Sequence, residues 1–155
     1  MPENHEKDDE VDLYDAFIEL GSRTLTETDI INFAGVSGDF YPLHTSDLFA
    51  KKSIFGKIIA HGLLTLSISS GLWTSSKIFQ NYIIAFYGIS SLRFIRPVYP
   101  GDTLVVKVKF LAEEEKRDMK LVSFISNTFV GKSIVMELEA KFLMDRKFLM
   151  PSLKR

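Results

Sequence analysis

The chain has no cysteine among its 155 residues. Disulfide bridges, thiolate metal sites and a cysteine nucleophile are therefore excluded. Because cysteine-poor chains that need no disulfide suit a reducing compartment, we expect a cytoplasmic protein.

An excess of either charge is also lacking, since 19 basic and 20 acidic side chains leave a formal net charge of −1. The basic surface that binds nucleic acid or an anionic membrane is therefore not expected. Residues 1–12, MPENHEKDDEVD, have neither the basic start nor the apolar run of a secretion signal. We interpret them as a disordered acidic tail.

Charged residues are missing from one long run, residues 58–76, which contains no Asp, Glu, Lys or Arg. Ser, Thr, Gly and His take about half of its positions, whereas a membrane-spanning helix needs about 20 predominantly apolar residues. A helix without a polar face must be buried. The run therefore predicts a soluble helix from His61 to Phe79 that the rest of the chain encloses on most sides.

The second half of the sequence has the apolar alternation of strands. Four strands are expected: one over residues 83–95, one that begins at residue 103, one over 121–130 and one over 134–142. A charged hairpin connection at 113–118 should join the second strand to the third. The strand at 121–130 is apolar on both faces and should be central. The sequence thus predicts an α+β domain over residues 13–145, an antiparallel sheet wrapped around one long helix, followed by a tail at 146–155.

Shorter elements are expected before the long helix. A short strand should resume at residues 23–25, and Thr26 should cap a short helix. A second short helix should span Asp47 to Lys52, with Leu48 and Phe49 on its inner side. A small sheet leaves an open edge, and pairing with a second copy is a common solution, so we expect a homodimer or a higher homo-oligomer.

A carboxylate and an imidazole, Asp39 and His44, lie five residues apart with Pro42 between them. Proline disfavours helix in the residue before it and fixes its own φ, so we expect an ordered loop from Asp39 to His44. Gly62 stands near the start of the long helix, where free N–H groups and the helix dipole hold a developing negative charge. These features predict an active site that moves protons and stabilises an oxyanion.

Four segments carry a resemblance to a known family: GDFYPLH at 38–44, FA at 49–50, FGKIIAHGL at 55–63 and FIRPVYPGD at 94–102. Together they resemble the signature of the MaoC-like dehydratases, the (R)-specific enoyl-CoA hydratases. The similarity covers residues 24–142. It implies the hot-dog fold, a sheet wrapped around a long helix and usually dimeric.

The resemblance also implies a reaction, the reversible hydration of a trans-2-enoyl-CoA to the (R)-3-hydroxyacyl-CoA. No metal or redox cofactor is implied, and the coenzyme A thioester is a substrate. Asp39 and His44 would activate one water, the Gly62 N–H would stabilise the enolate oxygen, and Ser70 would support His44. His61, judged on its own, is a capping or core histidine.

Tyr41 departs from the pattern, because the family often has Asn there, and this affects the expected substrate range. Two other functions remain open. A hot-dog acyl-CoA thioesterase would use the same scaffold with a carboxylate directed at the thioester carbonyl. A non-catalytic acyl-thioester-binding subunit would fit a Tyr41 side chain that fills the acyl pocket.

Overall fold

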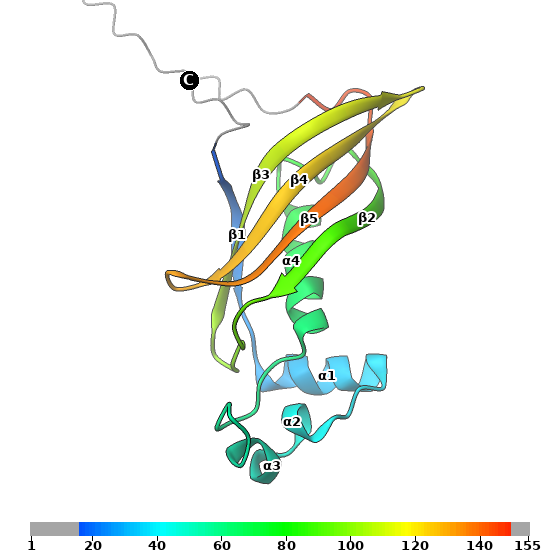
Figure 1. Cartoon of the computed structure of the whole chain (residues 1–155). Helices are drawn as coiled ribbons and strands as arrows, with labels where there is room; N and C mark the ends of the chain where they lie inside the picture. The colour runs from blue at the N-terminus through cyan, green and yellow to red at the C-terminus, as the bar shows by residue number, and fades with distance from the viewer. Residues whose placement is uncertain (1–15, 150–155) are drawn as a thin grey trace, which may run out of the picture.

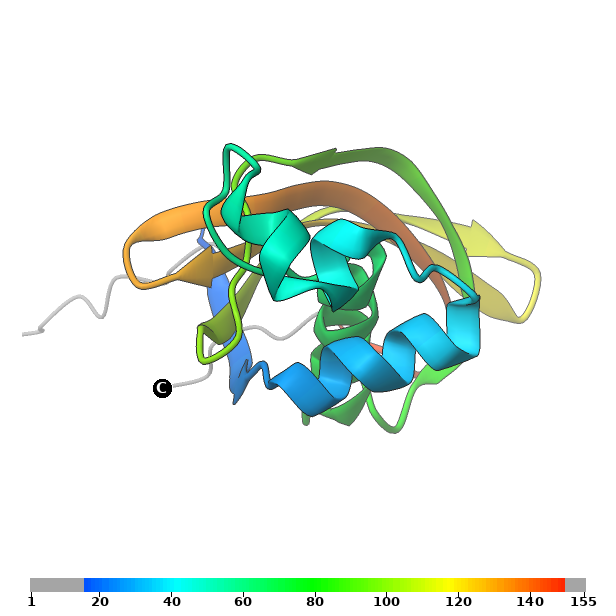
Figure 2. The same ribbon diagram turned by 90° about the horizontal axis from the view of Figure 1, so that it is seen from below.

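The computed structural model describes residues 16–149, so the tail expected at residues 1–12 lies outside the described part of the chain. A single curved sheet packs against one long helix, and three shorter helices lie at one end of it (Figures 1 and 2). In chain order the elements are β1 (Ile18–Thr24), α1 (Glu27–Ser37), α2 (Pro42–Thr45), α3 (Asp47–Lys51), α4 (Gly62–Ser75), β2 (Ile83–Phe94), β3 (Thr103–Lys116), β4 (Met119–Val130) and β5 (Ser133–Asp145).

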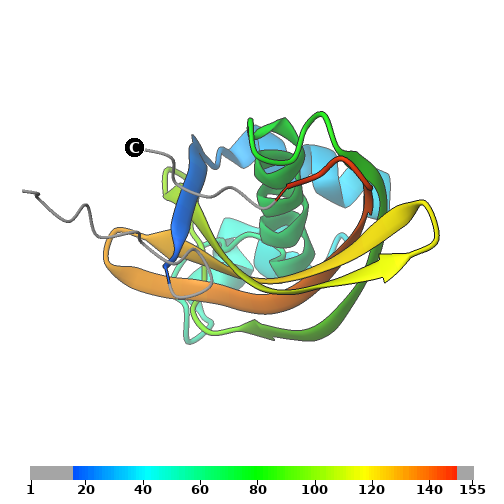
Figure 3. The same ribbon diagram turned by 90° about the horizontal axis from the view of Figure 1, so that it is seen from above.

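The sheet is antiparallel, with five strands in the order β1-β3-β4-β5-β2. It curls around α4, as the view from above shows (Figure 3). β4 lies in the middle, which confirms the central strand expected over residues 121–130. The wrapped-sheet architecture predicted from the sequence is therefore confirmed.

The core lies between the inner face of the sheet and α4. Alternate residues of β3 point inward and are fully buried, as the alternation predicted. Trp73 of α4 packs edge-on against Phe124 and Phe142 of the sheet, and its Nε1–H donates to the Ser126 hydroxyl at 2.9 Å. A buried hydrogen bond of this kind fixes the rotation of the helix, and with it the position of its N-terminus.

The strands extend further than the sequence suggested. β1 begins at Ile18 rather than at residue 23, and β3 and β4 continue through the charged segment to a tight turn at Arg117, whose φ is 56°. The charges do not end the strands because they lie on a two-stranded ribbon where opposite charges pair. Lys116 contacts Glu114 at 2.7 Å, and Lys120 contacts Glu113 at 3.3 Å.

The C-terminal segment packs back onto the domain. Phe148 is 1% exposed, and its ring stacks on Phe79 with centroids 6.4 Å apart. The Phe148 carbonyl also accepts a hydrogen bond from the Lys120 ammonium at 3.1 Å. The packed part of the chain therefore continues past residue 145, where the sequence placed its end.

The long helix is shorter and less enclosed than expected. α4 ends at Ser75, because the Ser76 N–H and hydroxyl both donate to the Trp73 carbonyl and the chain then turns to bring Phe79 into the core. Within this single chain, α4 exposes one face, which includes Leu63 and Gly71. No helix of the described residues is long and apolar enough to cross a membrane.

The short helix α3 corrects another expectation. Leu48 is 76% exposed and Phe49 is also exposed, whereas Ala50 is buried. A helix of five residues places few side chains inward, and here the small alanine approaches the domain most closely. The expected inner face of Leu48 and Phe49 is therefore wrong for the single chain.

Candidate active site

The end of α1 delivers Asp39 to the site. Thr26 begins α1 with a capping box: its hydroxyl accepts from the Asp29 N–H, and the Asp29 carboxylate accepts from the Thr26 N–H. Gly38 ends the helix at a φ of 77° and bonds back to the Ala34 carbonyl. Because that left-handed conformation favours glycine, the chain turns sharply just before Asp39.

His44 lies in a one-turn helix rather than in the expected loop. Pro42 is the first residue of α2, a position that suits proline because its φ is already helical and its missing N–H would be unpaired there. The restriction that proline imposes falls on Tyr41, which is extended with φ −54° and ψ 131°. The non-helical conformation expected before proline is confirmed for Tyr41, whereas the loop expected at His44 is wrong.

The hydrogen bond of His44 decides its tautomer. Its Nδ1 lies 2.8 Å from the Ile59 carbonyl oxygen. A carbonyl only accepts, so Nδ1 carries the proton. In the neutral ring Nε2 then has a free lone pair, which makes it the atom that can accept a proton.

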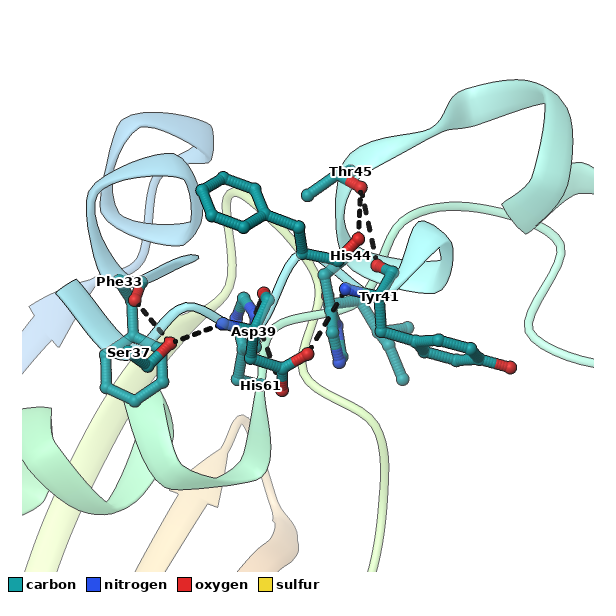
Figure 4. A network of polar contacts seen from close by, with 9 residues as sticks. Phe33, Ser37, Asp39, Tyr41, His44, Thr45 and His61 are labelled. Carbon is teal, nitrogen blue, oxygen red and sulfur yellow. Dashed lines mark hydrogen bonds and ion pairs between the residues drawn. The ribbon is translucent and has the colours of Figure 1, made fainter. Parts of the chain in front are cut away.

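Asp39 is anchored beside the two histidines. Its carboxylate accepts the Tyr41 N–H at 3.2 Å, and its own N–H donates to the Ser37 hydroxyl at 3.2 Å. The other carboxylate oxygen lies 4.0 Å from Nε2 of His61, and the side chain is 51% exposed. Asp39, His44 and His61 thus converge between α1, α2 and the start of α4, with candidate ligand atoms within 4.8 Å of one another (Figure 4).

These three residues do not fit a shared metal ion. The rings of His44 and His61 are stacked, with centroids 3.9 Å apart and planes inclined by 28°. Imidazole lone pairs lie in the ring plane, and two planes inclined by only 28° at this separation do not converge within metal–ligand distance of the rings. Nδ1 of His44 and Nε2 of His61 are also engaged by carbonyl oxygens. The geometry suits proton transfer rather than metal ligation.

Gly62 and His44 both line a cavity of about 290 Å³. Its other walls are largely apolar and include Phe55, Ile59 and Phe94. Gly62 is the first residue of α4, and none of the hydrogen bonds found among the described residues uses its N–H. A Cβ at this position would lie 2.9 Å from the Phe94 ring, so only glycine fits without a shift.

Two residues suggested by the sequence are not brought to the cavity. The Ser70 hydroxyl donates to the Ser67 carbonyl at 2.9 Å within its own helix, eight residues or about 12 Å along α4 from Gly62. Tyr41 is exposed beside His44 and Phe49 and does not fill the cavity. Within the described chain, Ser70 therefore has no contact that supports His44.

Phe94 and the Ile59 carbonyl are the site features that the sequence analysis did not assign. Phe94 lies in a segment of the resemblance, but nothing in the sequence indicated that its ring packs against Gly62. The Ile59 carbonyl is a backbone group, and no side-chain pattern marks it. Both residues lie in segments that carry the family resemblance, 55–63 and 94–102. That membership was the only sequence feature that pointed to this region.

Comparison with known proteins places this geometry in a family. Residues 16–130 match the model of the MaoC-like domain. The chain belongs to the MaoC-like dehydratase family. It accordingly has the hot-dog fold that the family resemblance implied.

The MaoC-like relatives include named enzymes. The (R)-specific enoyl-CoA hydratase of Rhodospirillum rubrum is 33% identical over 128 residues, which are 81% of this chain and 84% of that enzyme. Protein MaoC of Klebsiella aerogenes is 45% identical over 86 residues, 56% of this chain but only 25% of that protein's length. The structure of a monoamine oxidase regulatory protein from Archaeoglobus fulgidus has a TM-score of 0.73 at 36% identity, covering 85% of this chain and 90% of that one.

Proposed function

We propose that this MaoC-like protein is a hydratase that adds water reversibly to a trans-2-enoyl-CoA and forms the (R)-3-hydroxyacyl-CoA. One observation carries the proposal. His44, with its free Nε2, and Gly62, with its unused N–H, line one largely apolar cavity, and the Asp39 carboxylate lies close to His44. Proton transfer to a conjugated thioester needs these three groups.

The first half of the proposed reaction uses the two acid–base side chains. A water molecule between the Asp39 carboxylate and Nε2 of His44 gives one proton to His44 while its oxygen bonds to C3 of the enoyl group. His44 can take this proton because Nδ1 already donates to the Ile59 carbonyl. A positioned general base of this kind typically accelerates a reaction by about 10²–10⁴-fold.

The second half concerns the negative charge. As the C3–O bond forms, the electrons of the double bond move toward the thioester oxygen and produce an enolate. The Gly62 N–H at the start of the 14-residue helix α4 donates to that oxygen, and the helix dipole adds a favourable field. Proton return from His44 to C2 completes the addition and regenerates the neutral base.

Two facts support the substrate class. The cavity that contains His44 and Gly62 has apolar walls suited to an acyl chain. The enzyme from Rhodospirillum rubrum that covers most of this chain is named for the same reaction.

Substitution of the two acid–base residues tests the proposal. Asp39→Asn and His44→Gln should each lower the kcat for crotonyl-CoA hydration by about 10²-fold or more. Their circular dichroism spectra and melting temperatures should stay near wild type, because neither side chain is in the core. Asp118→Asn, in the distal β3–β4 turn, is the matched carboxylate control and should keep full activity. Wild-type hydration activity in both site variants would contradict the proposed hydratase function.

We also propose that the protein acts as a homodimer. β2 lies at one edge of the sheet and exposes Ile84, Phe86 and Tyr87, apolar side chains that water disfavours. A second copy would cover them. Light scattering coupled to gel filtration should give twice the 17.6 kDa chain mass, and a monomer at micromolar concentration would contradict the expectation.

A further inference from the structure

His61 is a nearly completely buried polar side chain beside the acid–base pair. It is 2% exposed, it caps the start of α4, and it touches both members of the acid–base pair. We infer that His61 is a positioning residue that holds the Asp39 backbone with one ring edge and His44 with one ring face. The inference rests on the proposed hydratase function and assigns His61 no contact with substrate.

The first contact is a hydrogen bond to the backbone of Asp39. Nε2 of His61 lies 2.9 Å from the Asp39 carbonyl oxygen, across 22 residues of sequence. Because the carbonyl only accepts, His61 carries its proton on Nε2. The bond ties the segment after α1 to the N-terminus of α4, so the Asp39 carboxylate keeps its place relative to the Gly62 N–H.

The second contact is the ring stack with His44. The 3.9 Å separation of the ring centroids leaves no room for water between the two imidazoles. His44 is held on its edge by the Ile59 carbonyl and on its face by His61. Two constraints from different directions fix both the position and the tilt of the ring, and aligned catalytic groups depend on such support.

A packing role alone does not account for a histidine here. Nδ1 of His61 is buried and has no hydrogen-bond partner among the described residues. A buried polar atom without a partner costs free energy that a phenyl ring in the same space would avoid. The opposite nitrogen, Nε2, offsets this free-energy cost, because its N–H donates to the Asp39 carbonyl and a phenyl ring has no such donor.

The ring also has a purely structural neighbour that supplies a control. Phe33 of α1 packs against His61 with centroids 5.0 Å apart and makes none of the described contacts with Asp39 or His44. Phe33→Leu therefore loosens the packing around His61 and leaves both positioning contacts in place.

Two substitutions separate the donor from the ring. His61→Phe keeps a buried ring but removes the bond to the Asp39 carbonyl, and it should lower kcat at least tenfold while the KM for crotonyl-CoA stays within threefold. His61→Gln restores an amide donor at the end of a side chain of similar reach, so it should recover part of the lost kcat. Phe33→Leu should keep kcat within twofold. The inference is overturned if folded His61→Phe keeps wild-type kcat, or if Phe33→Leu loses as much.

A second readout does not depend on activity. The chain has three histidines, so ¹⁵N-edited NMR of the imidazole rings can assign each one. The inference requires that the neutral ring of His61 is the Nε2–H tautomer and that the neutral ring of His44 is the Nδ1–H tautomer. An Nδ1–H tautomer at His61 would overturn it, whatever the enzyme assay shows. Correct tautomers in a protein that hydrates no enoyl-CoA would instead reject the proposed function and leave the geometry intact.

Discussion

Substituting Gly62 by alanine places a methyl group where the Phe94 ring already lies. The new Cβ would be 2.9–3.0 Å from three atoms of that ring, closer than side chains normally approach. Phe94 is 48% exposed, so its ring can move outward without disrupting the core. We therefore expect the clash to be relieved by a shift of Phe94 within the cavity that holds the substrate.

The effect on stability should be small. Overpacking costs about 1–3 kcal/mol in a closed core, but Phe94 is at the surface, and alanine gains about 0.4–1 kcal/mol over glycine where its φ is compatible. The two contributions largely cancel. The melting temperature should change by only a few degrees.

The effect on activity should be large. Alanine keeps the backbone N–H, but its methyl group and the displaced ring would lie beside that donor and keep the thioester oxygen away from it. Losing the use of one oxyanion donor typically costs about 10²–10³-fold in kcat. Crotonyl-CoA hydration measures kcat and KM directly, and thermal unfolding measures stability in the same preparations. The control is Gly71→Ala in the same helix, because nothing lies within 4 Å of its added Cβ. Wild-type kcat in Gly62→Ala would refute the role of Gly62.

Two further predictions concern stability. Burial opposes the charge of Asp29, but hydrogen bonds from Thr26 and the Arg23 guanidinium outweigh it and lower the pKa of that carboxyl. Its contribution is therefore present above the unfolded pKa of about 3.9 and is lost as pH falls through the folded value. Asp29→Asn should cost about 1 kcal/mol at pH 7 in urea unfolding, and an equal deficit at pH 2 would contradict this. Phe148→Ala should cost about 3–5 kcal/mol, because a fully buried ring is lost against Phe79; a cost below 1 kcal/mol would show that the segment does not pack in solution.

The sheet could be read from the sequence because its pattern is local. Alternate apolar residues of β3 predicted the buried face, and the doubly apolar run of β4 predicted the central strand. The extension of β3 and β4 through the charged segment near Arg117 was not predicted, since residue charge does not show whether a partner strand supplies opposite charges. The sequence of the short, mixed tail left open whether Phe148 packs back onto the domain or frays, and the structure shows that it packs back.

The candidate site was predictable only in part. Asp39 and His44 share a short segment, and Gly62 follows from the helix start, so their residue types indicated the chemistry. The contacts of His61 join positions 22 residues apart, and the bond from His44 reaches the Ile59 backbone, which no side-chain pattern marks. The bond of Ser70 within its own helix also shows that a role implied by resemblance depends on placement.

The most direct test of the proposed function is the reaction of the purified wild-type protein with crotonyl-CoA. The absorbance of the conjugated enoyl thioester should fall, and a coupled dehydrogenase specific for the (R)-alcohol should oxidise the product. Unchanged absorbance with crotonyl-CoA and with longer and branched enoyl-CoAs would contradict the hydratase assignment. Release of free coenzyme A thiol from a saturated acyl-CoA would then identify a thioesterase, and tight binding without turnover a non-catalytic subunit.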